Sequence, residues 1–211
     1  MNKNNFKILI TFVILTFLFL SQGYSNILKP FDLNIISYIQ NLENEWLTKF
    51  YKMITIIADT YQSAIITILL VALLYIKKYY REALFLTITM SACGLAMPLL
   101  KNIFSRERPN FYRLIEISGY SFPSGHTASA TTMYLTLAII LLSIMKKLNK
   151  YYVFNIAVLG IVIIGSSRIY LVVHYPTDVL AGFTLAFGLL NAIYPTYDRI
   201  RFEWRFQSKQ K

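Results

Sequence analysis

The sequence predicts an all-α, polytopic membrane protein, a bundle of six transmembrane helices formed by a single domain that covers residues 1–211. Of the 211 residues, 56% are apolar and only 15% are charged, whereas soluble domains have roughly a quarter of their residues charged. The apolar residues form long runs, and the basic residues collect in alternate connections between these runs. Together the three observations exclude a soluble globular domain.

The charge balance and the cysteine count narrow the class further. Lys and Arg outnumber Asp and Glu by 21 to 10, and the net charge of +11 suits either nucleic acid or an anionic membrane surface. The apolar excess favours the membrane, so we expect the bilayer as a partner and no nucleic acid. The single cysteine, Cys93, excludes a disulfide framework and a cysteine-based zinc site.

Six apolar stretches are long enough, or nearly so, to cross a hydrocarbon core of about 30 Å, which takes roughly 20 helical residues. The first stretch permits a second interpretation, because basic residues, a short apolar run and then Ser21 and Gly23 also describe a cleaved signal peptide. Cleavage would leave five spans and the same orientation for the rest. The six stretches cover residues 8–24, 61–76, 83–100, 127–145, 152–171 and 179–194.

The distribution of basic residues predicts the orientation of the bundle. Thirteen of the 21 Lys and Arg lie before the first span or after the second, fourth and sixth spans. The other eight lie on the opposite side, seven in the connections and Arg168 at the outer end of the fifth span. The positive-inside rule therefore places both termini in the cytoplasm. Four of the eight basic residues expected outside crowd into residues 101–113, which topology alone does not explain.

Residues 25–60 form the one long connection expected outside the membrane. Trp46, Phe50, Ile54 and Ile57 recur there at helical spacing. The pattern fits a helix that lies in the membrane interface, and it fits equally well a packed helix that caps the bundle.

Three groups of polar residues lie at the expected outer ends of the spans, at residues 101–109, 121–126 and 167–178, and they contain both histidines of the chain, His126 and His174. Taken singly, such residues are explained as snorkelling lysines or helix caps. Those explanations do not account for their gathering on one side of the membrane. A site at the extracytoplasmic end of the bundle does.

A phosphate site explains the residue types in these groups. Guanidinium and ammonium groups bind phosphate oxygens, and a helix N-terminus adds free backbone N–H groups. One histidine can attack phosphorus while the other protonates the departing oxygen, and Asp178 follows His174 at a distance that lets it fix the imidazole tautomer. No carboxylate cluster is present to hold a metal, so we expect no metal and no cofactor. The predicted phosphate ligands are Lys101, Arg108, Ser124, Gly125 and Arg168.

The three groups resemble the signature motifs of the type 2 phosphatidic acid phosphatase family, Lys-x6-Arg-Pro, Pro-Ser-Gly-His and Ser-Arg-x5-His-x3-Asp. Every spacing is kept here, in Lys101…Arg108-Pro109, Pro123-Ser124-Gly125-His126 and Ser167-Arg168…His174…Asp178. The segment around the first two motifs is most similar to bacterial phosphatidylglycerophosphatase B-like proteins.

The resemblance implies a metal-independent lipid phosphatase of a bacterial cell membrane that acts through a phosphohistidine intermediate. In that family's scheme His174 is the nucleophile, Asp178 its partner and His126 the general acid. The five predicted ligands then hold the phosphoryl group. Arg106 lies between motif positions, and we expect its replacement by lysine to be nearly silent because nothing in the motif requires its planar fork.

The sequence leaves several functions open. The substrate can be a lipid phosphate of the phosphatidylglycerophosphate or phosphatidic acid type, or undecaprenyl pyrophosphate, because both present a phosphate at the outer surface with an apolar tail. A non-catalytic lipid-phosphate binding or transport protein is a remote alternative, because recognition does not need an intact nucleophile. Head group, tail length and oligomeric state are not determined.

Overall fold

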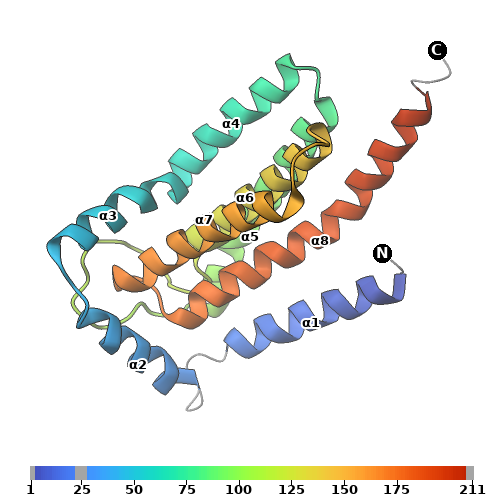
Figure 1. The fold of residues 1–211 in the computed structure, drawn as a ribbon. Coiled ribbons are helices and arrows are strands. Elements are labelled where there is room, and N and C mark those ends of the chain that lie inside the picture. Colours follow the sequence, from blue (N-terminus) through green and yellow to red (C-terminus); the bar gives the residue numbers. More distant parts are fainter. Residues whose placement is uncertain (1–2, 22–27, 208–211) are drawn as a thin grey trace.

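The computed structural model describes residues 3–21 and 28–207, and every regular element within them is helical (Figure 1). The all-α prediction is therefore confirmed. The elements are α1 (Lys3–Ser21), α2 (Leu28–Gln40), α3 (Glu45–Thr55), the short 3-10 helix η1 (Ile56–Ala58), α4 (Thr60–Ile76), α5 (Tyr80–Phe104), α6 (Gly125–Ile144), α7 (Lys150–Tyr170) and α8 (Pro176–Gln207).

The number of membrane spans is only partly confirmed. Within the described residues four helices, α5 to α8, are long and apolar enough to cross a membrane, and a fifth span results if the pair 45–58 and 60–76, bent by 53°, counts as one. Helix α1 follows the first predicted span as far as Ser21, and residues 22–24 of that prediction lie outside the described residues. The chain is an integral membrane protein with four or five such spans among the described residues, and six spans are not established.

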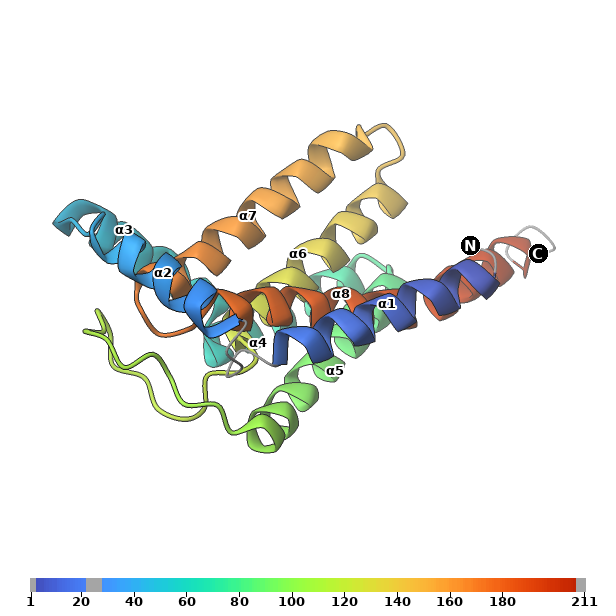
Figure 2. The same cartoon turned by 90° about the horizontal axis from the view of Figure 1, so that it is seen from below.

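Helix α6 is the centre of the bundle. In its apolar 18-residue stretch 61% of the residues are buried, against 28–33% for α5, α7 and α8. Small side chains such as Ala128, Ala130 and Thr131 are buried along it, and small residues let membrane helices approach closely. Helices α5, α7 and α8 pack around α6, and α1 runs beside α8 (Figures 1 and 2).

The predicted connection 25–60 is mostly helical and covers one end of the bundle (Figure 1). Helix α3 packs on α7 through Tyr51, whose ring centroid lies 4.8 Å from that of Tyr170, and the Tyr170 hydroxyl lies 2.9 Å from the hydroxyl of Thr48. Trp46 stays 77% exposed. The helix therefore packs on the bundle with Tyr51 and Thr48, whereas Phe50 and Ile57 of the predicted stripe are exposed like Trp46. Both interpretations of the stripe, the membrane interface and the packed cap, stay predictions.

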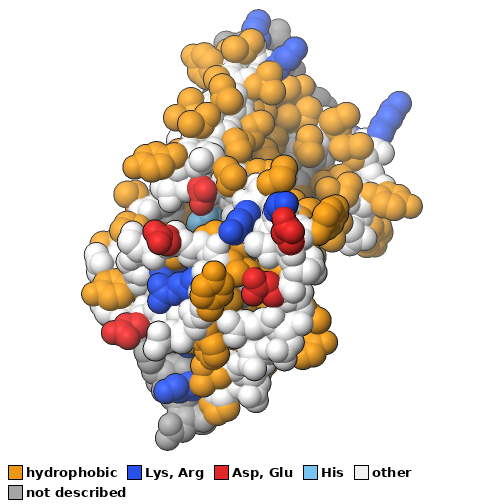
Figure 3. All heavy atoms as spheres, turned by 90° about the vertical axis from the view of Figure 1, so that its left-hand side faces the viewer, with side chains coloured by type: hydrophobic (Ala, Val, Ile, Leu, Met, Phe, Trp, Pro, Cys, Tyr) orange, Lys and Arg blue, Asp and Glu red, His pale blue; other side chains and the backbone are white. Residues whose placement is uncertain are grey.

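All three polar groups lie at this same end, where α5 ends, α6 begins and α7 turns into α8 (Figure 1). Helices α1 and α8 have their first and last described turns at the opposite end. Figure 3 looks onto the capped end, where acidic and basic side chains gather around a visible histidine.

Candidate active site

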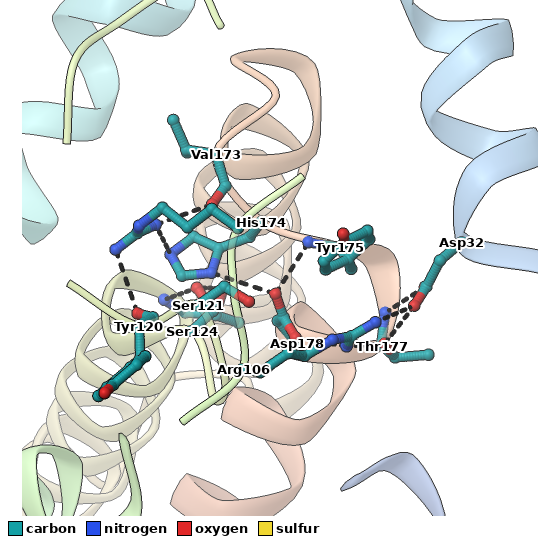
Figure 4. Close-up of polar contacts among 12 residues, drawn as sticks. Asp32, Arg106, Tyr120, Ser121, Ser124, Val173, His174, Tyr175, Thr177 and Asp178 are labelled. Atoms are coloured by element: carbon teal, nitrogen blue, oxygen red, sulfur yellow. Dashed lines mark hydrogen bonds and ion pairs between the residues drawn. The ribbon is translucent and has the colours of Figure 1, made fainter. Parts of the chain in front are cut away.

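The fold brings the three predicted motifs into direct contact. The backbone N–H of Ser124 donates to the carbonyl of Asp178 over 3.0 Å, which joins the second motif to the third. Lys101 Nζ and Arg108 Nη2 both donate to the carbonyl of Tyr120, at 2.6 and 3.2 Å, which joins the first motif to the loop before the second. Figure 4 shows how these segments converge on His174.

A tight turn between α7 and α8 positions His174. Helix α7 ends at Tyr170, and Val172 adopts a left-handed conformation with φ of 57°. The N–H groups of Val173 and His174 then both donate back to the carbonyl of Arg168. The turn leaves the imidazole 1% exposed.

Asp178 lies in the first turn of α8 and faces the same imidazole (Figure 4). Its Oδ2 accepts from the N–H of Tyr175 at 2.9 Å, in the manner of a helix capping group, and lies 3.5 Å from His174 Nδ1. On the other side of the ring, Arg108 Nη1 lies 3.4 Å from Nε2. A guanidinium can only donate, so Nε2 has to accept, and the imidazole proton then belongs on Nδ1, toward Asp178.

The surroundings of His174 keep its ring neutral. Burial is the main cause that lowers the pKa of His174 well below its usual value, and the positive charges of Arg168, Arg108 and Lys101 act in the same direction. An unprotonated Nε2 at neutral pH is the form that can attack phosphorus.

Arg168 is the predicted ligand whose donors are least used. Its Nη1 donates to Thr55 Oγ1 at 2.8 Å, whereas its buried Nε and Nη2 have no hydrogen-bond partner within the described part of the chain. The side chain is 1% exposed. Leaving buried N–H groups unpaired costs about 1–3 kcal/mol each, so this guanidinium is suited to an anion.

Arg108 and Lys101 are held mainly by backbone carbonyls. Arg108 donates to the carbonyls of Gly119, Ser118 and Val173, in addition to that of Tyr120. Burial, partly offset by Asp178, lowers the pKa of Arg108 to about 10, which leaves it charged at neutral pH. These bonds order the loop between α5 and α6 around two positive charges.

The second motif begins α6 as predicted. Ser124 is the N-cap, its Oγ accepting from Thr127, and Gly125 is the first helical residue. Helix α8 crosses here so closely that a Cβ at Gly182 would lie 2.5 Å from the Ser124 carbonyl oxygen. The close crossing holds the N-terminus of α6 against the start of α8, beside Asp178.

His126 follows in the first turn of α6, and its Nε2 lies 2.5 Å from Asp59 Oδ1. The His126 side chain is 12% exposed and the Asp59 side chain 41%. Asp59, between η1 and α4, was not among the residues that the sequence pointed to.

Two further contacts come from the connection 25–60 and were also missed. Asp32 on α2 accepts from Arg106 Nη2 at 2.8 Å and from Thr177, and Thr55 accepts from Arg168. The only sequence signal for Asp32 was its position as a lone acidic residue in the apolar pattern of α2. No sequence signal pointed to Thr55 or Asp59. The predicted loop thus contributes side chains to all three motifs.

The expectation that nothing requires the planar fork of Arg106 is wrong. The Arg106 side chain is buried, its Nη1 donates to Asp178 Oδ1 at 2.7 Å, and its Nη2 reaches Asp32 (Figure 4). The guanidinium also lies 4.0 Å from the ring centroid of Tyr175. The two ends of the planar fork bind two different carboxylates, so the structure does require an arginine.

Within the described ranges, 3–21 and 28–207, no group of three or more His, Cys, Asp or Glu side chains is arranged to hold a metal ion. The positive charges around His174 come from Lys101, Arg108 and Arg168.

The chain is similar to known proteins in both sequence and fold. Phosphatidylglycerophosphatase B of Bacillus subtilis (strain 168) is 30% identical over 199 residues, covering 92% of this chain and 96% of that protein. Lipid A 4'-phosphatase of Porphyromonas gingivalis is 28% identical over 187 residues, covering 81% of this chain and 75% of that protein. The crystal structure of a transmembrane PAP2-type phosphatidylglycerolphosphate phosphatase from Bacillus subtilis superposes with a TM-score of 0.85 at 28% identity, covering 90% of this chain and 96% of that one. Residues 82–202 match the family model of the PAP2 superfamily, and the chain therefore belongs to that superfamily.

Proposed function

We propose that this protein removes the phosphate group from a membrane lipid phosphate of the phosphatidylglycerophosphate or phosphatidic acid type. The observation that carries the proposal is Arg168, whose buried Nε and Nη2 have no partner among the described residues and whose charge acts on the buried His174. A nucleophile next to unpaired cationic donors is suited to a phosphate monoester. The names of the two relatives, both phosphatases of lipids, support the same substrate class.

The reaction runs in two steps. His174 Nε2 attacks phosphorus, and the bond from phosphorus to the lipid oxygen breaks while His126 gives its proton to that oxygen. Water then attacks the phosphohistidine, His126 takes a proton from the water, and the nitrogen–phosphorus bond breaks to release inorganic phosphate. Asp178 stabilises the imidazolium character that His174 gains in the first step.

The negative charge of the phosphoryl group is met by Lys101, Arg108 and Arg168, with Ser124 and the N-terminus of α6 at Gly125 as neutral donors. Three fixed cations supply the stabilisation that a metal ion would give, so the reaction proceeds without one. Vanadate, which adopts the geometry of a transferring phosphoryl group, should inhibit it.

We place the site at the extracytoplasmic surface, with both termini in the cytoplasm. The distribution of basic residues supports this orientation. In the fold, the described ends of α1 and α8 lie opposite the capped end that holds His174 (Figure 1).

Phosphate release from a panel of lipids in detergent tests the proposal. The panel contains phosphatidylglycerophosphate, phosphatidic acid and undecaprenyl pyrophosphate, with His174→Ala as the blank, in the presence of a strong chelator. We expect release from one or both monoesters by the wild type and none by the variant. Release only from undecaprenyl pyrophosphate would assign the competing substrate, and full activity of His174→Ala would remove the nucleophile assignment.

A further inference from the structure

The carboxylate of Asp59 does not cap the helix that it precedes. Asp59 is the N-cap residue of α4, a position where an aspartate normally accepts from a backbone N–H of the first turn, yet its side chain makes no such capping bond. Its Oδ1 lies instead 2.5 Å from Nε2 of His126, which is 67 residues away in the sequence. The chain bends by 53° at this point, between the helices that precede and follow Asp59.

His126 lies among positive charges. Arg168 on α7 and Lys101 on α5 both act on it electrostatically, and His126 in turn acts on His174. These two positive charges disfavour protonation of the His126 imidazole. Asp59 is the one acidic group that acts on His126 among the described residues.

From these contacts we infer that Asp59 and His126 form a second carboxylate–histidine pair, in which Asp59 holds the imidazole so that it carries the proton for the leaving oxygen. The inference rests on the function proposed above. Because Nε2 is engaged with Asp59, Nδ1 is the nitrogen that transfers the proton. Asp59 is thus a positioning residue that acts through His126, as Asp178 acts through His174. The Asp59 side chain is 41% exposed, so the pair can exchange protons with water between turnovers.

The pair matters most for substrates with a poor leaving group. A lipid monoester expels an alkoxide, which needs a proton as the phosphorus–oxygen bond breaks. A pyrophosphate expels a phosphate, which leaves readily as an anion. Loss of the carboxylate should therefore slow monoester hydrolysis far more than pyrophosphate hydrolysis, an asymmetry that simple damage to the fold would not produce.

Asp59→Asn tests the inference, since it keeps the shape of the side chain and removes its charge. We expect kcat for the lipid monoester to fall about 10- to 100-fold, because Asp59 supports the general acid and its loss should cost no more than the loss of the acid itself. The kcat for undecaprenyl pyrophosphate should change less than about threefold. The upper pH limit of monoester kcat/KM should move to lower pH, because the imidazolium loses its counter-charge. Asp59→Glu should restore much of the activity, and Asp59→Asn should add nothing to His126→Ala.

The matched control is Glu45→Gln, which removes one carboxylate from the same connection at an exposed ion pair with Lys49 and should leave activity and pH profile unchanged. Equal loss on both substrates, or an unmoved pH limit, would overturn the role of Asp59. If Asp59→Asn does not fold, Asp59→Ser decides in its place, because it also removes the carboxylate and keeps a side chain suited to a helix N-cap. An unmoved pH limit in Asp59→Ser would contradict the inference. A wild type that cleaves no lipid phosphate would instead overturn the proposed function.

Discussion

At the scale of single residues, the site is organised by buried charges that hold one another. Arg106 binds Asp178 with one nitrogen and Asp32 with the other, and Asp178 in turn faces His174. Removing one partner from a buried charge pair leaves the other uncompensated, which costs more than the pair contributes. The orientation of the predicted nucleophile therefore depends on residues that do not touch the phosphate.

Arg106→Lys is expected to be damaging. A single ammonium group cannot reach both carboxylates, and a buried carboxylate left without its partner costs about 3–5 kcal/mol. Thermal unfolding in detergent and kcat on a lipid monoester should both decline. The control is Arg113→Lys in the same loop, where the side chain is exposed and its Nε donates to the carbonyl of Pro109. Identical behaviour of the two variants would show that the fork of Arg106 is dispensable.

The neutral state of His174 predicts the acidic side of the pH profile. The nucleophile is active above the pKa of His174 in the folded protein and is lost as the pH falls through it. Since burial and neighbouring cations lower that pKa, the acidic limb of kcat/KM should lie below the ordinary histidine value of about 6.5. Below that value the unfolded chain binds the proton more readily, so stability should also decline as the pH falls, and unfolding is measured at each pH. An acidic limb at or above 6.5 would contradict this account.

At the scale of elements, the crossing of α6 and α8 sets the geometry of the site. The N-cap of α6 and the first turn of α8 are joined by the bond from Ser124 to the Asp178 carbonyl. One turn further on, Gly182 provides the space for the α6 backbone. A glycine is required here because a side chain would meet backbone atoms, which cannot rotate away.

Gly182→Ala should therefore disturb both stability and activity. The added Cβ would lie 2.5 Å from the Ser124 carbonyl oxygen, and such overpacking costs about 1–3 kcal/mol. The melting temperature in detergent and kcat are the measurements. Gly94→Ala in α5 is the control, because nothing lies within 4 Å of a Cβ there, and it should be neutral or slightly stabilising. Equal effects of the two substitutions would mean that the crossing tolerates a side chain.

At the scale of the whole molecule, one end carries the clustered polar side chains and the other holds the described ends of α1 and α8 (Figures 1 and 3). Thirteen of the 21 basic residues lie in the segments that the sequence predicts to be cytoplasmic. If the bundle is oriented as proposed, lipid phosphates reach His174 from outside the cell, and the phosphate is released there.

Labelling of single cysteines in intact cells tests this orientation. A membrane-impermeant thiol reagent should label Asn110→Cys, in the exposed loop of the first motif, and spare Lys147→Cys, in the exposed turn between α6 and α7. The native Cys93 is 1% exposed and serves as the unlabelled background. Labelling of Lys147→Cys alone would reverse the topology and make the substrate a cytoplasmic lipid.

The sequence by itself determined the all-helical membrane class and the motif residues at the site. Apolar runs are visible in one dimension, because a bilayer requires each span to be apolar along its own length. The motif residues Lys101, Arg108, His126, His174 and Asp178 were predicted from chemistry and spacing, and the fold places them at one end of the bundle. The number of spans does not follow from the apolar runs alone, since α4 has only 17 residues and forms a candidate span only together with the bent segment before it.

Only the tertiary structure decided which residues support the motifs. Asp32, Thr55 and Asp59 lie in a connection whose pattern indicated no more than a helix, and their partners stand 74, 113 and 67 residues away. Local periodicity carries no record of such contacts, because they depend on how the helices pack and where the chain bends. The same reason explains Arg106, which appeared expendable between two motif positions until the fold placed a carboxylate at each end of its fork.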